Sequence, residues 1–392
     1  MRIITKGPLI LGVFSLACFI NGCGQNTASS GKPPAVRTTV KAPHTTPDAS
    51  KGNTSHVSST AVKTLPPIMA LNWASSTVGY LAASSTIYRI TTGKYAWSPW
   101  YHSHHVITSL TTTPKSVWIT TSQSLLEILR ANTRQREYSV TLPVKGTPQM
   151  ITVESSTNAY LLDAGHIYRL DIATNQWAPV SSNLGSINSM VWLSPTTGYA
   201  TVGKTVWRTT SGGHAWTVAF SAPVVGDHWH GQIVANSSNS LWFLATGGVN
   251  GMSQTGFVLW HGTVNGTQWT AITDEAYWSP TGYPSVHPAV SSSIMQPGDL
   301  LATGQHTVYL TGWNSNPSSH WVILTNYLGR WTSYDISIKP TTPDFFMPPT
   351  ILSFSTSTTG FLAGQTEMGK GSIMESNDGG ATWHSLSLTS TE

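Results

Sequence analysis

Five histidines gather in two short stretches of the chain, and imidazole nitrogens are ligands that zinc and copper accept. The first stretch holds His102, His104 and His105, and the second holds His228 and His230. No His-Glu-x-x-His motif and no cysteine pair accompanies them. A metal site is therefore one hypothesis for these residues, but the sequence favours a protein without a metal or another cofactor.

Acidic residues in neighbouring stretches indicate a second chemistry, the hydrolysis of a glycosidic bond. Glycosidases use two carboxyl groups that lie about 5.5 Å or about 6.5–9.5 Å apart. The candidates here are Asp227, Asp274, Glu275 and Asp344. Only their separation in space decides whether such a pair forms. A carbohydrate-active hydrolase therefore stays the alternative to a non-catalytic protein, and no catalytic residue is assigned.

Aromatic side chains accompany these histidines and acids, and Trp and Tyr are good anchors for a protein or for a sugar ring. Together they form a candidate binding face for a macromolecule, either a protein or a glycan. The members of this face are Trp100, Tyr101, His102, His104, His105, Asp227, His228, Trp229, His230, Asp274, Glu275, Tyr277, Trp278, Trp313, Phe345 and Phe346. The alternative is that the aromatic members fold back and cap the core beneath them.

The composition limits which elements can position these residues. Charged residues make up 9 % of the 392 residues, against about 25 % in an average soluble domain, so long solvated helices and coiled coils are excluded. Residues 1–66 carry seven basic and one acidic side chain, whereas residues 67–392 carry 13 basic and 15 acidic ones. The basic excess thus belongs to the leader and the segment that follows it, and the sequence argues against a nucleic-acid-binding face. The small number of carboxylates also favours a domain that stays folded at acid pH.

The N-terminus predicts export and a lipid anchor. Arg2 and Lys6 precede an apolar run from Leu9 to Ile20, which is typical of a signal peptide covering residues 1–22. The run ends in Ile20-Asn21-Gly22-Cys23, which resembles the bacterial lipobox, so Cys23 is the expected site of diacylation. Two acyl chains are enough for stable anchoring at the extracytoplasmic side of the cell membrane. An ordinary secretory signal with a chance cysteine is the alternative.

Two further domains follow from composition and repeats. Residues 23–66 are rich in Ser, Thr and Pro and predict a disordered stalk. Residues 67–392 contain seven copies of a unit with four short β-type runs, exemplified by Ser189–Leu193, Gly198–Val202, Thr205–Thr209 and Trp216–Phe220. Seven such units predict an all-β, seven-bladed β-propeller of four-stranded antiparallel blades.

An interval of eight residues between a third-strand position and a later aromatic residue recurs in every unit. The seven pairs are Arg89 and Trp97, Arg130 and Tyr138, Arg169 and Trp177, Arg208 and Trp216, His261 and Trp269, Ile323 and Trp331, and Glu375 and Trp383. This spacing assigns Arg89, Arg130, Arg169 and Arg208 to one repeated strand position, where their stems cover the surface between blades.

The turn before the last strand carries a family resemblance. Its best copy fits the pattern S-x-D-x-G-x-T-W through Ser376, Asp378, Gly380 and Trp383, and a degenerate copy contains Thr209, Gly213 and Trp216. The chain therefore resembles the BNR/Asp-box propellers, which include sialidase-like proteins and the photosystem II assembly-factor type. In this turn the Asp carboxylate is expected to cap backbone N–H groups, while Gly takes a positive φ and Trp packs beneath.

The resemblance implies a fold more firmly than an activity. Sialidases of this fold hold their substrate carboxylate with three arginines opposite the Asp-boxes, and no arginine here falls in those loops, so sialidase activity is disfavoured. Long, aromatic connections are instead predicted on one face only, which favours binding. We expect a monomeric, membrane-anchored lipoprotein whose propeller is a non-catalytic binding or assembly module for a protein or glycan partner. The assembly-factor type implies a membrane-protein client.

Overall fold

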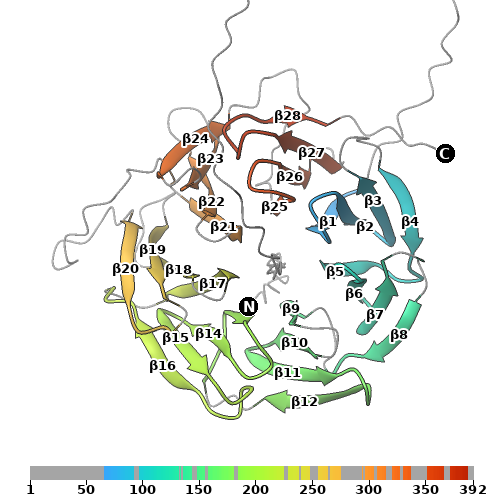
Figure 1. The fold of residues 1–392 in the computed structure, drawn as a ribbon, viewed down its shortest axis with the longest axis horizontal. Coiled ribbons are helices and arrows are strands. Elements are labelled where there is room, and N and C mark those ends of the chain that lie inside the picture. The colour runs from blue at the N-terminus through green and yellow to red at the C-terminus, as the bar shows by residue number, and fades with distance from the viewer. Residues whose placement is uncertain are drawn as a thin grey trace, which may run out of the picture.

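The structure is a computed structural model that describes the larger part of residues 66–386 (Figure 1). The described residues are 66–91, 97–131, 133, 136–143, 148–154, 158–180, 184–224, 228–237, 240–247, 255–263, 265–274, 294, 296–303, 307–314, 320–326, 330–336, 351–365 and 371–386. The leader, Cys23 and the stalk lie outside them, so the lipid anchor and the domain boundaries stay predictions. Among the described residues no helix is long and apolar enough to cross a membrane.

The described residues form seven antiparallel sheets, each of four strands that follow one another in the chain. Blade 1 has β1 (Ile68–Trp73), β2 (Val78–Ala83), β3 (Thr86–Thr91) and β4 (Ser98–His102). Blade 2 has β5 (Ile107–Thr112), β6 (Ser116–Thr121), β7 (Leu125–Arg130) and β8 (Arg136–Thr141). Blade 3 has β9 (Met150–Val153), β10 (Asn158–Asp163), β11 (His166–Asp171) and β12 (Gln176–Val180). Blade 4 has β13 (Ser189–Trp192), β14 (Gly198–Val202), β15 (Thr205–Thr209) and β16 (Thr217–Ser221).

The last three blades repeat the same order. Blade 5 has β17 (His230–Ser237), β18 (Ser240–Gly247), β19 (Gly256–Gly262) and β20 (Trp269–Asp274). Blade 6 has β21 (Gln296–Thr303), β22 (Thr307–Asn314), β23 (His320–Thr325) and β24 (Thr332–Ile336). Blade 7 has β25 (Ile351–Phe354), β26 (Gly360–Gln365), β27 (Gly371–Ser376) and β28 (His384–Ser385).

The sheets stand around a common axis, with the first strand of each blade innermost and the fourth at the rim (Figure 1). Contacts join each innermost strand to that of the next blade, and β25 contacts β1, so the ring is closed. The predicted seven-bladed propeller is confirmed. The strands of blade 4 differ from their predicted bounds by one residue at most.

Apolar side chains lie between blades because both faces of every sheet are covered by a neighbour. Seven clusters of buried residues fill the seven interfaces. Between blades 3 and 4, for example, the ring of Tyr160 stacks on Trp192 with centroids 3.7 Å apart. Burying a large aromatic side chain contributes roughly 2–3 kcal/mol, so this packing is the main force that holds the ring together.

Tyrosines of the second strands add a repeated polar contact between blades. The hydroxyl of Tyr80 in blade 1 donates to the carbonyl oxygen of Ala131 in blade 2, at 3.1 Å. Tyr309 in blade 6 donates in the same way to the carbonyl oxygen of Ser357 in blade 7, at 3.2 Å. Burial of the phenol raises the tyrosine pKa, to about 12 at Tyr160 of blade 3. The hydroxyls of Tyr80 and Tyr160 therefore stay protonated and keep donating.

The predicted register of blade 2 is wrong. In blade 1 the second-strand aromatic Tyr80 pairs with Arg89, but the corresponding Trp118 pairs with Ile128. Arg130 lies two residues farther along β7, where it is exposed. Arg130 is therefore not equivalent to Arg89, and its interval of eight residues to an aromatic is a coincidence of sequence.

Candidate functional site

The two faces of the ring differ in the connections they carry. Turns between second and third strands, and connections between blades, leave the sheets on one face, here called the loop-rich face. The longest intervals between strands, residues 275–295 and 337–350, start and end there. On the opposite face, turns join first to second and third to fourth strands, and the longest intervals are 210–216 and 377–383.

A tight hydrogen-bonded turn in blade 7 holds the best Asp-box sequence on the opposite face. The Asp378 carboxylate accepts bonds from the backbone N–H of Thr382 at 2.9 Å and from its hydroxyl at 2.6 Å. The Ser376 hydroxyl donates to the same carboxylate and accepts from the N–H of Gly380, each at 2.8 Å. The indole N–H of Trp383 donates to the Gly380 carbonyl at 2.9 Å, and Gly380 has a φ of +93°. The predicted local chemistry is present.

The turn of blade 4 has the same conformation with a serine in place of the aspartate. Thr209 accepts from the N–H of Gly213 at 2.9 Å, and Ser211 accepts from the N–H of Ala215 at 2.9 Å. The indole of Trp216 donates to the Gly213 carbonyl at 3.0 Å. A neutral hydroxyl thus replaces the carboxylate without changing the fold of the turn.

Blade 5 contains a third turn of this kind that the sequence analysis missed. The indole N–H of Trp269 donates to the carbonyl of Gly266 at 3.0 Å, and Gly266 has a φ of +65°. A Gly-x-x-Trp spacing is shared by all three turns and would have found it. The residues of these turns bond to one another, so their role is structural.

Trp100 and Tyr101, predicted members of the binding face, point into the ring. Trp100 is 4 % exposed and packs edge-on against Tyr80, at 4.8 Å between centroids. The hydroxyl of Tyr101 donates to the buried Glu127 carboxylate at 2.9 Å, and an arginine, Arg136, lies 3.5 Å from the same carboxylate. Desolvation and this bond raise the pKa of Tyr101 to about 12. The prediction that Trp100 is a surface anchor is wrong, because the end of β4 turns its indole into the interface between blades 1 and 2.

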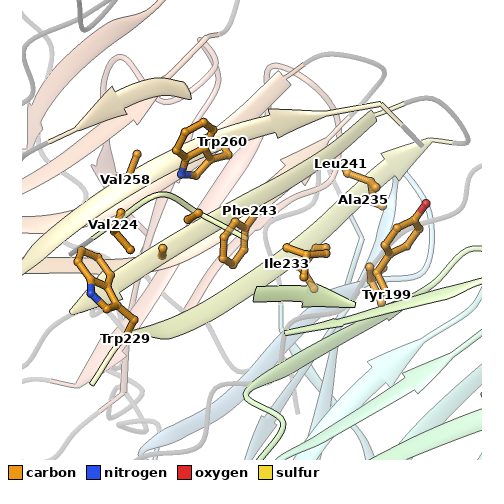
Figure 2. Packing of buried hydrophobic residues seen from close by; sticks show 13 residues of the cluster. Tyr199, Val224, Trp229, Ile233, Ala235, Leu241, Phe243, Val258 and Trp260 are labelled. Atoms are coloured by element: carbon orange, nitrogen blue, oxygen red, sulfur yellow. The ribbon is translucent and has the colours of Figure 1, made fainter. Parts of the chain in front are cut away.

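Trp229 is also part of the core. Its side chain is 7 % exposed and belongs to the cluster between blades 4 and 5, with Val224, Phe243 and Trp260 (Figure 2). Trp229 precedes β17, and the connection passes so close to blade 5 that a Cβ on Gly247 would meet the carbonyl oxygen of His228 at 2.6 Å. Because the connection lies against blade 5, the side chain of Trp229 packs into the interface between blades 4 and 5. The prediction that Trp229 is a surface anchor is therefore wrong as well.

The histidines lie on the loop-rich face and are accessible. His102 and His104 are exposed and His105 is half-buried. His228 and His230 are exposed as well, and Nδ1 of His230 lies 3.4 Å from the amide nitrogen of Asn188. The first group belongs to the connection of blades 1 and 2 and the second to that of blades 4 and 5, so the two groups sit apart on the ring. Among the described residues no group of His, Cys, Asp or Glu side chains is placed to hold a metal.

The other members of the predicted face give less structural information. Asp227, Glu275, Tyr277, Trp278, Phe345 and Phe346 lie outside the described residues. Only the backbone is described for Asp274, the last residue of β20, and for Trp313 in β22. Their part in a binding face stays a prediction.

Two polar residues on or near this face were not singled out from the sequence. His166 lies on the loop-rich face beyond a two-residue turn from Asp163, and it is exposed. Asp299 is buried in a bulge of β21, where its backbone N–H donates to the Thr311 hydroxyl at 2.8 Å. Desolvation raises the pKa of Asp299 to about 7. In the sequence Pro297 and Gly298 directly precede Asp299, and a proline and a glycine within a strand are the signal that could have indicated this bulge.

The closed ring with one loop-rich face defines the protein as a seven-bladed β-propeller. No family model matches the sequence, and no curated protein matches it either. Solved structures do share the fold. One is described as "YCF48 bound to D1 peptide", with a TM-score of 0.53, 15 % identity, and coverage of 80 % of this chain and 94 % of that one. Another belongs to a mitotic checkpoint complex, with a TM-score of 0.53, 11 % identity, and coverage of 86 % and 98 %. At these identities the likeness concerns the fold.

Proposed function

We propose that this chain is an exported lipoprotein, anchored through Cys23, whose propeller binds a protein partner without catalysing a reaction. Its finer assignment as a BNR/Asp-box propeller rests on the turns of blades 4 and 7. The observation that carries the proposed function is the asymmetry of the ring. One face carries short turns, of which those in blades 4 and 7 are held by bonds between their own residues, and the other face carries the longest connections. Long connections on a rigid scaffold are where proteins of this kind place binding residues.

The point at which the described chain begins supports a partner at the membrane. The described chain begins at Pro66, and β1 starts at Ile68 on the loop-rich face, because every inner strand follows a connection on that side. A lipid-anchored stalk would therefore join the propeller at its binding face. The similar propeller whose structure is described as bound to a D1 peptide supports a polypeptide ligand.

Site-specific crosslinking in native membranes tests this function. A photo-reactive amino acid is placed at position 104 on the loop-rich face, and the matched control carries it at position 214, which is exposed on the opposite face. We expect a defined protein adduct from position 104 and none from position 214. Equal adducts from both positions, or no protein adduct from position 104, would contradict the proposal.

The anchor is tested separately. We expect Cys23→Ala to move the protein from the membrane fraction to the soluble extracytoplasmic fraction, because the acylated thiol is lost. Retention of this variant in washed membranes would refute lipidation at Cys23 and would leave the binding function of the ring unaffected.

A further inference from the structure

Blade 1 has an unusual charge pattern. The sequence contains no Asp or Glu between Asp48 and Glu127, so no acidic side chain belongs to blade 1 or to the connection that follows it. Glu127 itself is 1 % exposed and is engaged by Tyr101 and Arg136. Any positive charge that this part of the loop-rich face acquires is therefore not neutralised by a carboxylate of its own blade.

Three histidines lie in this part of the face. His102, His104 and His105 lie at the end of β4 and in the connection to blade 2. The neighbours that face them are uncharged: Nδ1 of His102 lies 3.2 Å from the Thr86 hydroxyl, and the N–H of His105 donates to the Ser103 hydroxyl at 3.3 Å. Histidine side chains as a class gain a proton between about pH 8 and pH 5.

The turns packed against this connection are uncharged too. The N–H of Ser103 donates to the carbonyl of Ser85 at 2.8 Å, and the N–H of Ser122 donates to the carbonyl of Val106 at 2.8 Å. These bonds bring the turns 84–85 and 122–124 against the connection, and both turns contain only Ser and Gln. The described turns that pack against the histidines therefore contribute no charged side chain.

Exposed apolar side chains border the same histidines. Met69 is 43 % exposed and Val106 is 47 % exposed, and among the described residues only Val218 is a further large hydrophobic residue of this kind. Met69 stands in a bulge at the start of β1, beside the pair of Ile68 with Ala83 that precedes the turn 84–85. Val106 precedes β5. The N–H of Ile107 donates to the carbonyl of Ser84 at 2.8 Å, so Met69 and Val106 both lie on the loop-rich face where the connection that carries the histidines crosses the turn 84–85.

We propose that these five residues, the histidine sector (Met69, His102, His104, His105 and Val106), dock an acidic segment of the protein partner and hold it more tightly as the pH falls. The inference rests on the proposed function and adds to it the chemistry of the partner. The occupant follows from charge complementarity: protonated imidazoles on a blade without carboxylates of its own favour Asp and Glu, while Met69 and Val106 favour an apolar residue beside them.

A peptide-binding experiment tests this inference. The purified full chain in detergent is titrated into a fluorescein-labelled 12-residue peptide of alternating Glu and Leu, at pH 5.5 and pH 7.5. A peptide with Lys in place of Glu is the charge control. Three exposed charge pairs predict about tenfold tighter binding of the acidic peptide at pH 5.5 than at pH 7.5.

Two variants locate the effect. We expect the triple variant His102→Gln, His104→Gln and His105→Gln to lose the pH dependence, since glutamine keeps polarity without taking a proton. The matched double variant His214→Gln and His384→Gln changes two exposed histidines of the opposite face and should retain it. Thermal unfolding of both variants checks that the ring is intact.

Other outcomes overturn the inference. Equal affinity at the two pH values, or pH dependence retained in the triple variant, would refute the histidine sector. Histidine-dependent binding to phosphatidylglycerol vesicles, without binding to the acidic peptide, would replace the polypeptide with a lipid surface. A last experiment places the photo-reactive amino acid at position 106, beside the substituted histidines, in the triple variant. If this protein still forms the protein adduct in membranes at pH 5.5, with the same yield as the chain that keeps its histidines, the inference fails while the proposed function stands.

Discussion

The carboxylate of Asp378 gives the sharpest test of how the turns of the opposite face are stabilised. Asp378→Ala removes the acceptor of two bonds from Thr382 and of one from Ser376. Capping interactions of this kind contribute about 0.5–2 kcal/mol, and bonds to a charged group lie toward the upper end. Because the side chain is half-buried, we expect a loss of about 1–2 kcal/mol at pH 7, measured by urea unfolding with tryptophan fluorescence.

The pH dependence of this loss distinguishes the carboxylate from a neutral cap. Desolvation acts to raise the pKa of Asp378, but the bonds from Thr382 and Ser376 outweigh it and lower the pKa. A depressed pKa means that the stabilisation is present above the pKa of the unfolded chain, about 4, and is lost as the pH falls through the folded value. The effect of Asp378→Ala should therefore shrink from pH 7 to pH 3.

Blade 4 provides the matched control, because Ser211 occupies the equivalent position without a charge. We expect Ser211→Ala to lower stability by about 0.5–1 kcal/mol, equally at pH 7 and pH 3. A loss from Asp378→Ala that is as large at pH 3 as at pH 7 would refute the assignment of the charge-assisted bonds.

Three further substitutions test the packing of the ring. Trp229→Ala empties part of the cluster between blades 4 and 5, and urea unfolding should show a loss of about 3–5 kcal/mol. Gly213→Ala combines a φ of +91° with a clash of the new Cβ against Val180, so the same assay should show a loss of about 2–5 kcal/mol. Asp299→Asn removes a carboxyl group whose pKa is raised to about 7 by burial. The stability that such a group contributes is fully present below about pH 4 and is lost as the pH rises through 7. The gain in melting temperature from Asp299→Asn should therefore grow between about pH 4 and about pH 7.

Each of these substitutions has a contradicting result. Gly185 also has a positive φ, of +82°, but nothing lies within 4 Å of its Cβ position, so Gly185→Ala measures backbone strain alone. Equal losses at positions 213 and 185 would disprove the close packing on Val180. A loss below about 1 kcal/mol for Trp229→Ala would show that its indole is not in the core. An Asp299→Asn gain that is the same at pH 4 and pH 8 would rule out titration of this carboxyl.

The repeat could be found in the sequence because one physical requirement recurs in every blade. Each second strand needs a large side chain to fill the interface, as Tyr80, Tyr160, Tyr199 and Tyr309 do, and small or aliphatic residues around it. Short strands with tight turns then follow from the Gly, Ser and Thr between them. These local patterns were enough to predict the number of blades and the bounds of the strands in blade 4.

Register could not be predicted from spacing alone. In blade 6 Tyr309 pairs with Thr325, not with Ile323, and Thr325 pairs with Thr332, the residue after Trp331. The true interval to the tryptophan is therefore shorter than the eight residues of the predicted pattern. Pairing depends on where each turn closes, and turns of different length can place an aromatic residue at the same apparent spacing.

The candidate face shows where residue type is a poor guide to exposure. Trp100 and Trp229 lie next to exposed histidines in the sequence, yet both indoles pack between blades. Trp229 lies directly between His228 and His230, and Trp100 sits at a bulge of β4 between Pro99 and Tyr101. In both places the indole points into the core while the histidines stay at the surface. The aromatic residues of a connection therefore include core residues, and the histidines mark its outer surface.

Because every sheet uses four consecutive strands, the two ends of the propeller share no backbone ladder. The interface between blade 7 and blade 1 is held by side chains, as every other interface of the ring is. Trp73 and Phe361, whose rings are 4.7 Å apart, are examples. The positions of the termini around the circle are therefore arbitrary. Circular permutants that open the chain at another connection should assemble the same ring, and this interchangeability is what allows such a molecule to grow by duplicating a single module.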